Sequence, residues 1–341
     1  MQPATIGLDL AKHVFQVHGI DARGAVVLRK RLRRSELLHF FGGLPPCLVG
    51  MEACGTAHHW ARELAALGHT VRLMPATYVR PYVKRGKSDA LDAEAICEAV
   101  TRPTMRFVPV KSAEQQSVLM LHRTRELLVR QRTMLVNSLR GQLAEFGIVA
   151  PAGAWRMPEL QAAAMRAPPE RLPDLAWECV EVIVSQIEDL QRRIGDVERS
   201  ILAWHRTNEV SQRLETIPGV GLITATAIAA TVTNPAAFRS GRELAAWIGL
   251  VPRQSGTGGK VRLGPISKRG DAYLRRLLVL GATAVVRYAR GKPEKAAWVN
   301  APLARRPARV VTVAVANKLA RSAWALLTRG GTYRPPRPAV A

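Results

Sequence analysis

The stretch Ile6-Gly7-Leu8-Asp9-Leu10-Ala11-Lys12 decides how the N-terminal part of this sequence folds. Its apolar and β-branched residues predict a buried strand that continues through 13–17, and one carboxylate, Asp9, lies inside it. A buried Asp without a partner is costly, so we expect Asp9 to have a function or a local bonding partner. It is either the first ligand of a divalent-metal site or a strand-end residue that caps a turn.

The pattern after this strand predicts an α/β domain. A good turn at 21–24 makes 25–28 a hairpin partner of the first strand. Strands alternating with helices imply a central mixed sheet covered by helices. The further strands are expected at 47–52 and 71–74, and the helices at 35–40 and 58–67.

Three more carboxylates accompany Asp9. Glu52 ends a predicted strand, and Asp89 and Asp92 begin a helix that Ser88 or Asp89 can cap. Two carboxylates three residues apart share one helix face and repel each other unless a cation bridges them. Hard oxygen ligands of this kind suit Mg²⁺ or Mn²⁺. The alternative is that the Asp pair serves only as a helix cap.

The charge of the chain points to a polyanion as partner. Among 341 residues, 50 Lys and Arg stand against 26 Asp and Glu, a formal net charge of +24. Neutralised phosphates release counterions, so such an excess favours nucleic-acid binding. The basic segment before Asp89, with Lys84, Arg85 and Lys87, would hold a phosphate backbone beside the carboxylates.

A membrane is the weaker interpretation of this charge, because we find no apolar run that approaches the roughly 20 residues of a membrane span. We see no signal peptide, and the four cysteines form no CxxC pair. These features indicate a soluble, cytoplasmic protein with reduced thiols and no metal site built from cysteine.

Two long helices are predicted in the middle of the chain, at 112–146 and 175–205, with apolar residues at nearly heptad spacing. A Pro-, Ala- and Gly-rich break at 151–173 separates them. They most simply form an antiparallel pair, which is either a dimer interface or an intramolecular spacer.

The C-terminal part contains two motifs of interest. Residues 216–225 have the form of a helix-hairpin-helix turn, whose Gly219 and Gly221 either bring backbone N–H groups to a phosphate or serve plain packing. Residues 250–260 are expected to form a flexible polar loop. Helices are predicted at 243–249, 272–290 and 310–327, and the tail from Tyr333 is expected to be disordered.

Ser255 in that loop has two interpretations. A Ser among glycines is typical of a mobile linker, but it can also be an exposed nucleophile that a phosphate approaches closely. Nearby cations would stabilise the pentavalent transition state and contact the nucleic acid. They are Arg253, Lys260, Arg262, Lys268 and Arg269.

Six motifs occur here in a specific order. They are Gly7-Leu8-Asp9, Met51-Glu52-Ala53, Lys87-Ser88-Asp89-Ala90-Leu91-Asp92-Ala93, Ile217-Pro218-Gly219-Val220-Gly221, Gly249-Leu250-Val251-Pro252-Arg253-Gln254 and Ile266-Ser267-Lys268-Arg269-Gly270-Asp271. The series, which covers 5–329, closely resembles the DEDD-type transposases of the insertion-sequence one-ten family, most closely the eleven-eleven subgroup. The DNA invertases that switch pilin genes are relatives of that family.

The resemblance implies a ribonuclease-H-like domain of the Holliday-junction-resolvase type over 1–110 and a coiled-coil dimerisation region over 111–207. It further implies a mainly helical transposase domain with a serine over 208–330, followed by a disordered tail at 331–341. Such an enzyme recombines donor and target DNA under the guidance of a structured non-coding RNA. We expect it in the bacterial cytoplasm at the nucleoid, as a dimer or tetramer if the acidic tetrad of one subunit faces the serine of another.

Carried over residue by residue, the acidic tetrad of the family falls on Asp9, Glu52, Asp89 and Asp92. At the serine the sequence departs from the pattern, because an ungapped alignment puts Gly256 in the serine column. Ser255 is therefore the expected nucleophile, with Thr257 as the alternative.

Two other functions stay open at this stage. A metal-dependent junction resolvase or nuclease would use the tetrad with water as nucleophile. A non-catalytic nucleic-acid-binding module would explain the charge but not four acids in a basic chain.

Overall fold

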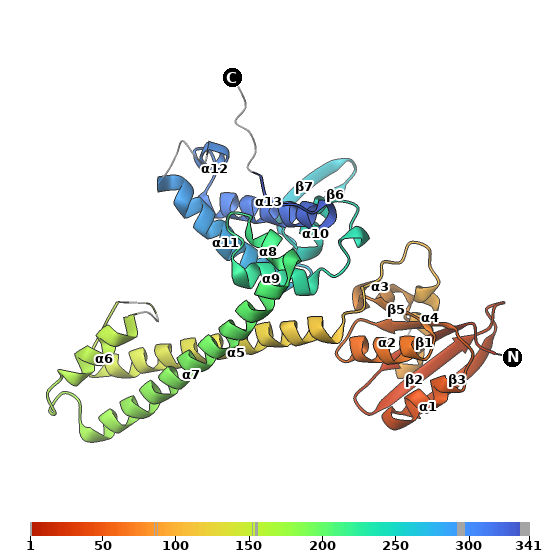
Figure 1. The fold of residues 1–341 in the computed structure, drawn as a ribbon, viewed down its shortest axis with the longest axis horizontal. Helices are drawn as coiled ribbons and strands as arrows, with labels where there is room; N and C mark the ends of the chain where they lie inside the picture. The colour runs from red at the N-terminus through yellow and green to blue at the C-terminus, as the bar shows by residue number, and fades with distance from the viewer. Residues whose placement is uncertain are drawn as a thin grey trace. The chain divides into compact units, whose positions relative to one another are not determined.

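The structure is a computed structural model, and it describes residues 2–84, 86, 88–151, 153, 156–291 and 297–334. The chain forms two compact units, Met1–Glu114 and Gln115–Ala341. Each unit has its own core, and each is described by itself (Figure 1).

A mixed five-stranded sheet is the centre of the first unit, in the order β3-β2-β1-β4-β5. Strands β1 to β3 form an antiparallel meander, whereas β1, β4 and β5 run parallel. This mixed sheet is consistent with the expected ribonuclease-H-like domain. The strands are β1 Thr5–Leu10, β2 Val14–Ile20, β3 Val26–Arg33, β4 Leu48–Glu52 and β5 Thr70–Met74.

The prediction of the first strand was wrong in the length of that strand. Residues 11–13 break it, and β1 and β2 form a hairpin in which Asp9 lies opposite Gln16. The predicted turn at 21–24 is confirmed, but residues 26–28 of the predicted partner belong to β3, which pairs across this turn with β2 and not with β1.

Helices cover both faces of the sheet. The helices α1 Leu37–Gly42 and α2 Ala57–Ala66 lie on the face where Phe15 and Trp60 meet edge to face, with ring centroids 5.3 Å apart. Helix α4, Asp89–Val100, packs on β1, β2 and β4. The short elements are α3 Ala76–Val79 and the 3₁₀ turns Arg34–Glu36 and Arg80–Tyr82.

Two glycines let α4 lie directly on the sheet. A Cβ atom on Gly7 of β1 would come within 2.1 Å of the Ala93 carbonyl oxygen and 2.4 Å of the Cys97 nitrogen. A Cβ on Gly50 of β4 would come within 2.7 Å of the Val100 Cβ. At Gly7 the backbone of the helix therefore meets the strand directly, whereas at Gly50 the Val100 side chain packs on the strand. The Ser88 hydroxyl accepts a hydrogen bond from the Leu91 N–H, so one of the two predicted caps is confirmed.

In the second unit, two long helices run side by side, α5 Ala113–Glu145 and α7 Asp174–Thr207 (Figure 1). Val136, Leu139 and Val180 belong to the apolar core that joins them. The expected break at 151–173 contains a further helix, α6 Met157–Met165, because its Leu160 and Ala164 are buried in the same core.

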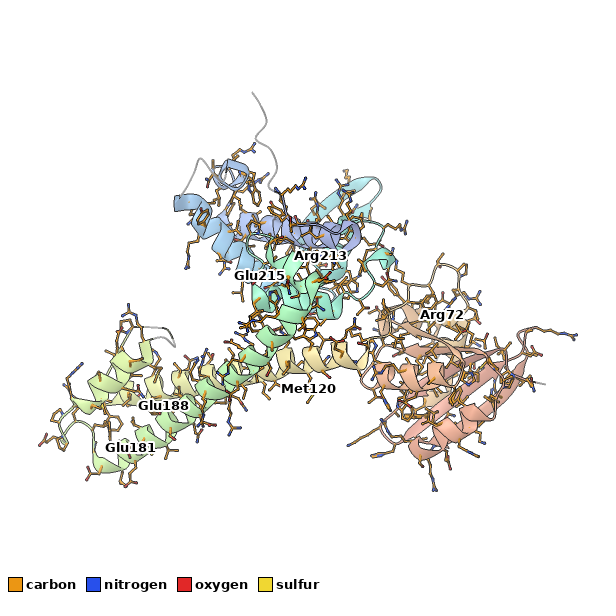
Figure 2. The ribbon with its side chains drawn as sticks, viewed as in Figure 1. Arg72, Met120, Glu181, Glu188, Arg213 and Glu215 are labelled. Atoms are coloured by element: carbon orange, nitrogen blue, oxygen red, sulfur yellow. The ribbon has the colours of Figure 1, made fainter. Side chains whose placement is uncertain are left out.

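Helix α5 also carries an apolar stripe that this chain leaves exposed. Met120, Leu127 and Met134 are seven residues apart, and each is more than half exposed (Figure 2 labels Met120). In the same part of α5, the Arg125 guanidinium forms an ion pair with Glu198 of α7 at 2.6 Å.

The rest of the unit is a helical bundle with one β-hairpin. The predicted loop 250–260 is wrong, because it forms β6 and the turn into β7. The elements are α8 Glu209–Glu215, α9 Leu222–Thr231, the 3₁₀ turn Pro235–Ala237, α10 Gly241–Ile248, β6 Pro252–Thr257, β7 Lys260–Ile266, α11 Ala272–Gly291, α12 Ala297–Leu303 and α13 Ala308–Arg329.

The tail is tied down where we expected disorder to begin. The Tyr333 N–H donates to the Thr216 hydroxyl at 2.9 Å, and Tyr333 packs against the core of the bundle. Residues 335–341 lie outside the described residues.

Helix α13 corrects the expectation that no apolar run has the length of a membrane span. By length and composition this helix could cross a membrane. However, its Val311, Val315 and Leu319 are buried in the core that α13 shares with α11. That burial is typical of the core helix of a globular domain.

Replacing Gly7 by Ala should destabilise the first unit, because the new Cβ would meet the α4 backbone at 2.1 Å. Overpacking of this kind costs about 1–3 kcal/mol or more. We expect faster hydrogen–deuterium exchange in peptides from β1 and α4. Gly42→Ala is the matched control, since nothing lies within 4 Å of its new Cβ. Equal protection of α4 in both variants would contradict the close packing.

Candidate metal centre and serine hairpin

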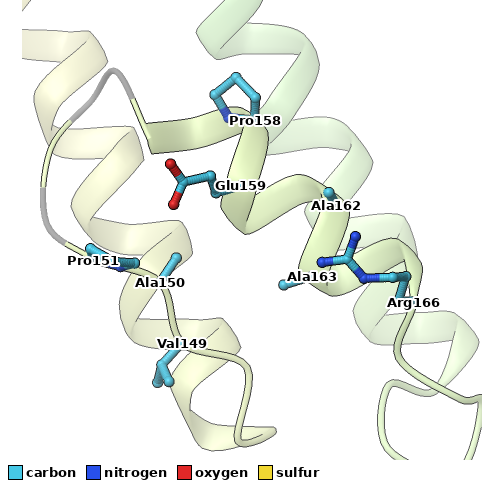
Figure 3. A pocket seen from close by; sticks show the side chains of 8 residues that line it. All are labelled: Val149, Ala150, Pro151, Pro158, Glu159, Ala162, Ala163 and Arg166. Atoms are coloured by element: carbon cyan, nitrogen blue, oxygen red, sulfur yellow. The ribbon is translucent and has the colours of Figure 1, made fainter.

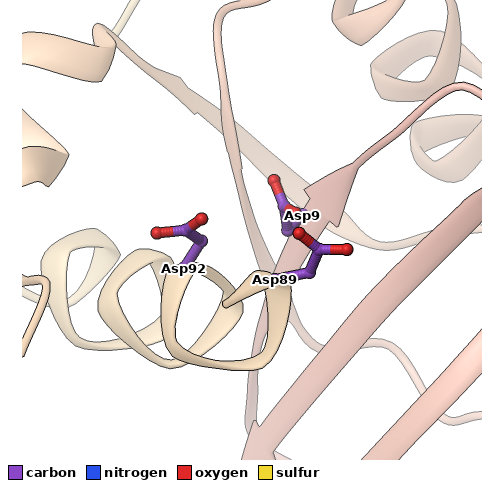
Figure 4. A group of neighbouring side chains, drawn as sticks. All are labelled: Asp9, Asp89 and Asp92. Carbon is purple, nitrogen blue, oxygen red and sulfur yellow. The ribbon is translucent and has the colours of Figure 1, made fainter. Parts of the chain in front are cut away.

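Three of the four predicted carboxylates come together at one end of the sheet. Asp9 lies near the end of β1, and Asp89 and Asp92 occupy the first turn of α4. One oxygen from each lies within 4.8 Å of the other two (Figure 4). The close approach of α4 at Gly7 sets this geometry, since it fixes the helix start over the strand that carries Asp9.

The cluster is electrostatically unfavourable by itself. The pKa of Asp9 is raised to about 6, first by burial and then by the charges of Asp92, Asp89 and Glu52 in that order. Among the described residues, no Lys or Arg forms an ion pair with any of the four carboxylates. Crowded carboxylates without a cationic side chain are the donor set that a hard divalent cation prefers.

Glu52 stands slightly apart from the other three. It ends β4, and burial raises its pKa, with Asp92 as the second cause. It is not in the group whose oxygens lie within 4.8 Å of one another. Glu52 is therefore coupled to Asp92 through charge, and its side chain would have to move to share a cation with the other three.

Cys54 is a neighbour of the site that the sequence did not indicate. The residue as a whole is exposed, but partial burial of its thiol raises the pKa of Cys54, and the charges of Glu52 and Asp9 raise it as well. Its position two residues after Glu52 was the available signal.

The basic segment before α4 behaves differently from our expectation. Lys84 forms an ion pair with Glu94 of α4, so its ammonium group is engaged within the chain. Arg85 and Lys87, the other two predicted phosphate contacts, lie outside the described residues.

Ser255 lies in an exposed β-hairpin. Gly258 and Gly259 make the turn with φ values of 54° and 77°, which L side chains rarely adopt. Ser255 pairs with Arg262. Thr257 pairs with Lys260. Directly opposite side chains share a face of the ladder, so both hydroxyls and both cations point to the same side. All four residues are exposed.

The root of the hairpin is held by close backbone packing. Gly249 ends α10 with φ 83°, and a Cβ there would lie 2.2 Å from the Arg269 carbonyl oxygen. A Cβ on Gly270 would lie 1.7 Å from the Trp247 carbonyl oxygen. The Arg275 guanidinium donates to the Arg269 carbonyl at 3.0 Å. These contacts leave the side chains of Lys268 and Arg269 exposed beside the root.

Arg253 at the start of β6 is also exposed, and its guanidinium donates to the Ser267 carbonyl at 3.5 Å. The predicted cations of this region therefore lie on one hairpin and its root.

The two glycines of the helix-hairpin-helix motif have different roles. Gly219 has φ 89°, and a Cβ there would meet Val285 at 2.6 Å and the Gly281 carbonyl at 3.0 Å. Packing against α11 thus explains Gly219. Gly221 is exposed just before α9, with nothing within 4 Å of a Cβ. Of the two, Gly221 has the backbone that a phosphate could reach.

A separate hollow of about 520 Å³ lies beside α6 and contains none of the predicted site residues (Figure 3). Its two charged lining residues are Glu159 and Arg166, and Glu159 already forms an ion pair with Arg156 at 2.9 Å. The rest of its lining is apolar.

Two family descriptions match the chain. A transposase family of the DEDD type, named for IS110, matches residues 6–148. The transposase IS116/IS110/IS902 family matches residues 211–297.

Curated relatives are similar over almost the whole length. A probable family 20 transposase of Pseudomonas aeruginosa is 53% identical over 98% of this chain and 100% of its own. The transposase for insertion sequence element IS1328 of Yersinia enterocolitica is 42% identical, covering 96% of this chain and 98% of its own. The transposase for IS1111A of Coxiella burnetii is 41% identical, covering 96% and 91%.

Removing one charge from the acidic cluster should have opposite effects with and without metal. Asp92→Asn relieves repulsion on Asp9, so we expect the metal-free protein to unfold at a higher temperature, with a gain of about 1 kcal/mol. The same variant should lose the stabilisation that Mg²⁺ or Mn²⁺ gives the unsubstituted protein. Calorimetry with and without each metal measures both effects.

Glu98→Gln is the control for this experiment, since Glu98 lies on α4 but pairs with Arg102 at the surface. It should keep the metal-dependent shift. An unchanged shift in Asp92→Asn would contradict the metal centre.

Proposed function

Because the chain belongs to the IS116/IS110/IS902 family of insertion-sequence transposases, and so is a DNA transposase, we propose how it cuts and rejoins DNA. Asp9, Glu52, Asp89 and Asp92 hold a divalent metal, and Ser255 is the nucleophile. The observation that carries the proposal is the approach of the Asp9, Asp89 and Asp92 oxygens to within 4.8 Å of one another.

The four carboxylates would hold Mg²⁺ or Mn²⁺, whose positive charge would orient the scissile phosphate and stabilise its oxygens during displacement. Asp9 lies on the central strand of the sheet, so it fixes the position of the centre. Asp89, which is exposed, lies on the side from which a nucleic acid would arrive.

Ser255 supplies the covalent step. Its Oγ forms a bond to the phosphorus, one ester P–O bond of the DNA breaks, and the departing DNA hydroxyl takes up the proton that the serine loses. Attack by a DNA hydroxyl on the phosphoserine then restores the serine and a phosphodiester. Each exchange conserves one phosphate ester bond, so strand transfer through a junction needs no external energy source.

The face of the hairpin supports this assignment. Ser255 lies directly opposite Arg262, and a guanidinium beside the reacting phosphate would stabilise its developing charge. Thr257 lies on the same face, opposite Lys260, and stays the alternative nucleophile. We further propose that Arg253, Lys268, Arg269 and Gly221 contact the phosphate backbone, together with Arg85 and Lys87. The ion pair of Lys84 and the packing of Gly219 make these two the weaker members of the predicted set.

We also propose that a structured non-coding RNA guides the enzyme to donor and target DNA in the bacterial cytoplasm, at the nucleoid. The net charge of +24 supports a second polyanion beside DNA. The domains proposed are 1–110, 111–207 and 208–330. A dimer or tetramer would form through the middle region, where Met120, Leu127 and Met134 offer an apolar stripe at heptad spacing.

One observation favours a second candidate, a metal-dependent nuclease or junction resolvase that uses water. Among the described residues, the Ser255 hydroxyl has no hydrogen-bond partner and so no neighbouring base. The acidic cluster would be complete without it. The two candidates differ in whether protein and DNA become covalently joined.

Substituting Ser255 by Ala should abolish strand transfer and the covalent protein–DNA adduct, because the attacking oxygen is lost. Binding of DNA should survive, since the hairpin keeps its cations. Denaturing gels of a reaction with a labelled element end measure the adduct. Thr257→Val is the matched variant, and it should retain most of the activity.

If Ser255→Ala still forms the adduct and Thr257→Val does not, the nucleophile is Thr257. If neither substitution matters and cleavage still needs metal, the water-dependent nuclease is correct. Asp9→Asn should abolish cleavage under either scheme.

RNA that copurifies with the full-length protein tests the guide. We expect sequencing of that RNA to yield one structured species that maps to non-coding DNA beside the gene. Its removal by ribonuclease should abolish recombination while leaving nonspecific DNA binding. Recombination by RNA-free protein would refute guidance.

A further inference from the structure

Strand β3 carries a row of arginines that the proposed function does not use. In the ladder Asp9 lies opposite Gln16, and Gln16 lies opposite Arg31. Directly opposite residues point to the same face of a sheet. Asp9 and Arg31 therefore share the face on which α4 lies, two strand spacings or about 10 Å apart.

Period-two alternation adds two more arginines to that face. Arg29 and Arg33 flank Arg31 at alternate positions, about 7 Å from it along the strand. Lys30 belongs to the other face, where its ammonium group lies over the Phe40 ring at 5.0 Å. Leu32, also on that other face, is buried in the core.

The arginine row is open to solvent. Helix α4 packs on β1 and β2, and β3 is the edge strand beyond them. Arg29, Arg31 and Arg33 are all exposed. Among the described residues, none of their side chains forms an ion pair with a carboxylate. Glu94, which interacts electrostatically with Arg29, is already paired with Lys84.

Charged residues on an edge strand also have a simpler use, since they prevent sheets from pairing edge to edge. That use depends on the charge of the edge and not on the face that carries it. Here three of the four cations from 29 to 33 lie on the face of the candidate metal centre, and the fourth packs on an aromatic ring.

We propose that Arg29, Arg31 and Arg33 form a phosphate track that binds the backbone of the DNA whose scissile phosphate lies at Asp9. The spacing of alternate strand residues is close to that of successive phosphates in an extended backbone. DNA is the partner because the chain is a DNA transposase and because, in the ladder, only the half-buried Gln16 separates Arg31 from Asp9 on this face of the sheet. The track deepens the proposed function, although its own test does not require Asp9 to be catalytic.

Salt dependence of DNA binding tests the track. Full-length protein is titrated with a fluorescein-labelled 20-base-pair DNA in EDTA, over a series of salt concentrations. Each lost phosphate contact lowers the slope of log K against log salt by about 0.9. We expect the magnitude of this slope to fall by about 2 to 3 in the triple variant R29Q/R31Q/R33Q and by about 1 in Arg31→Gln.

Lys30→Gln is the matched control, because it removes the same charge from the neighbouring residue on the opposite face. It should leave the slope unchanged. Equal losses in Lys30→Gln and Arg31→Gln would overturn the track in favour of a general charge effect. An unchanged slope in Arg31→Gln would also overturn the track. This outcome can be read even if the triple variant aggregates through the edge strand β3.

Two further measurements distinguish the phosphate track from an RNA-binding surface and from the proposed metal centre. A double-stranded RNA of the same sequence is titrated in parallel, and a loss confined to RNA would overturn the assignment to DNA. Asp9→Asn should keep the full slope while losing cleavage. Retained cleavage in Asp9→Asn would refute the proposed metal centre and leave the track standing.

Discussion

The absence of a side chain at Gly7 is the constraint on which the first unit depends. Any Cβ there would collide with the α4 backbone at the Ala93 carbonyl, so only glycine allows the helix to lie on β1. That contact sets the height of α4 above the sheet, and Gly50 sets it again on β4. The carboxylates of the first helical turn can meet Asp9 because the helix lies this low.

The same contact has an energetic cost. It brings like charges together in a half-buried place, and the pKa of Asp9 rises to about 6 as a result. Packing of the apolar core has to supply the free energy that holds the acids there. A fold optimised for stability alone would separate them. The cluster thus marks a place where the chain gives up stability, as functional sites commonly do.

Local pattern predicted most of this fold. Apolar runs identified β4 and β5, and the Ser88 cap located the start of α4. The β6–β7 hairpin was missed because every residue of β6 is exposed, so no apolar alternation separates a strand from a linker. The ion pair between Lys84 and Glu94 was also unpredictable, since it depends on how the segment before α4 returns over that helix. The sequence predicted all four carboxylates. That the Glu52 oxygens lie outside the group formed by Asp9, Asp89 and Asp92 could not be predicted.

The arrangement of charge within each unit follows from the geometry of strands and helices. Acids sit where a helix start meets a strand end, a site that burial partly screens from solvent. Cations sit on exposed strands, where a period of two collects them on one face, as with Arg31 on β3 and Arg262 on β7. Because the acids of the cluster form no ion pair with a Lys or Arg in the part of the chain that the structure describes, both sets of charges stay available to a ligand. A phosphate backbone carries the negative charge that complements the cations, and its metal ions carry the positive charge that complements the acids. In a purely structural arrangement, the acids and cations of the chain would have neutralised each other.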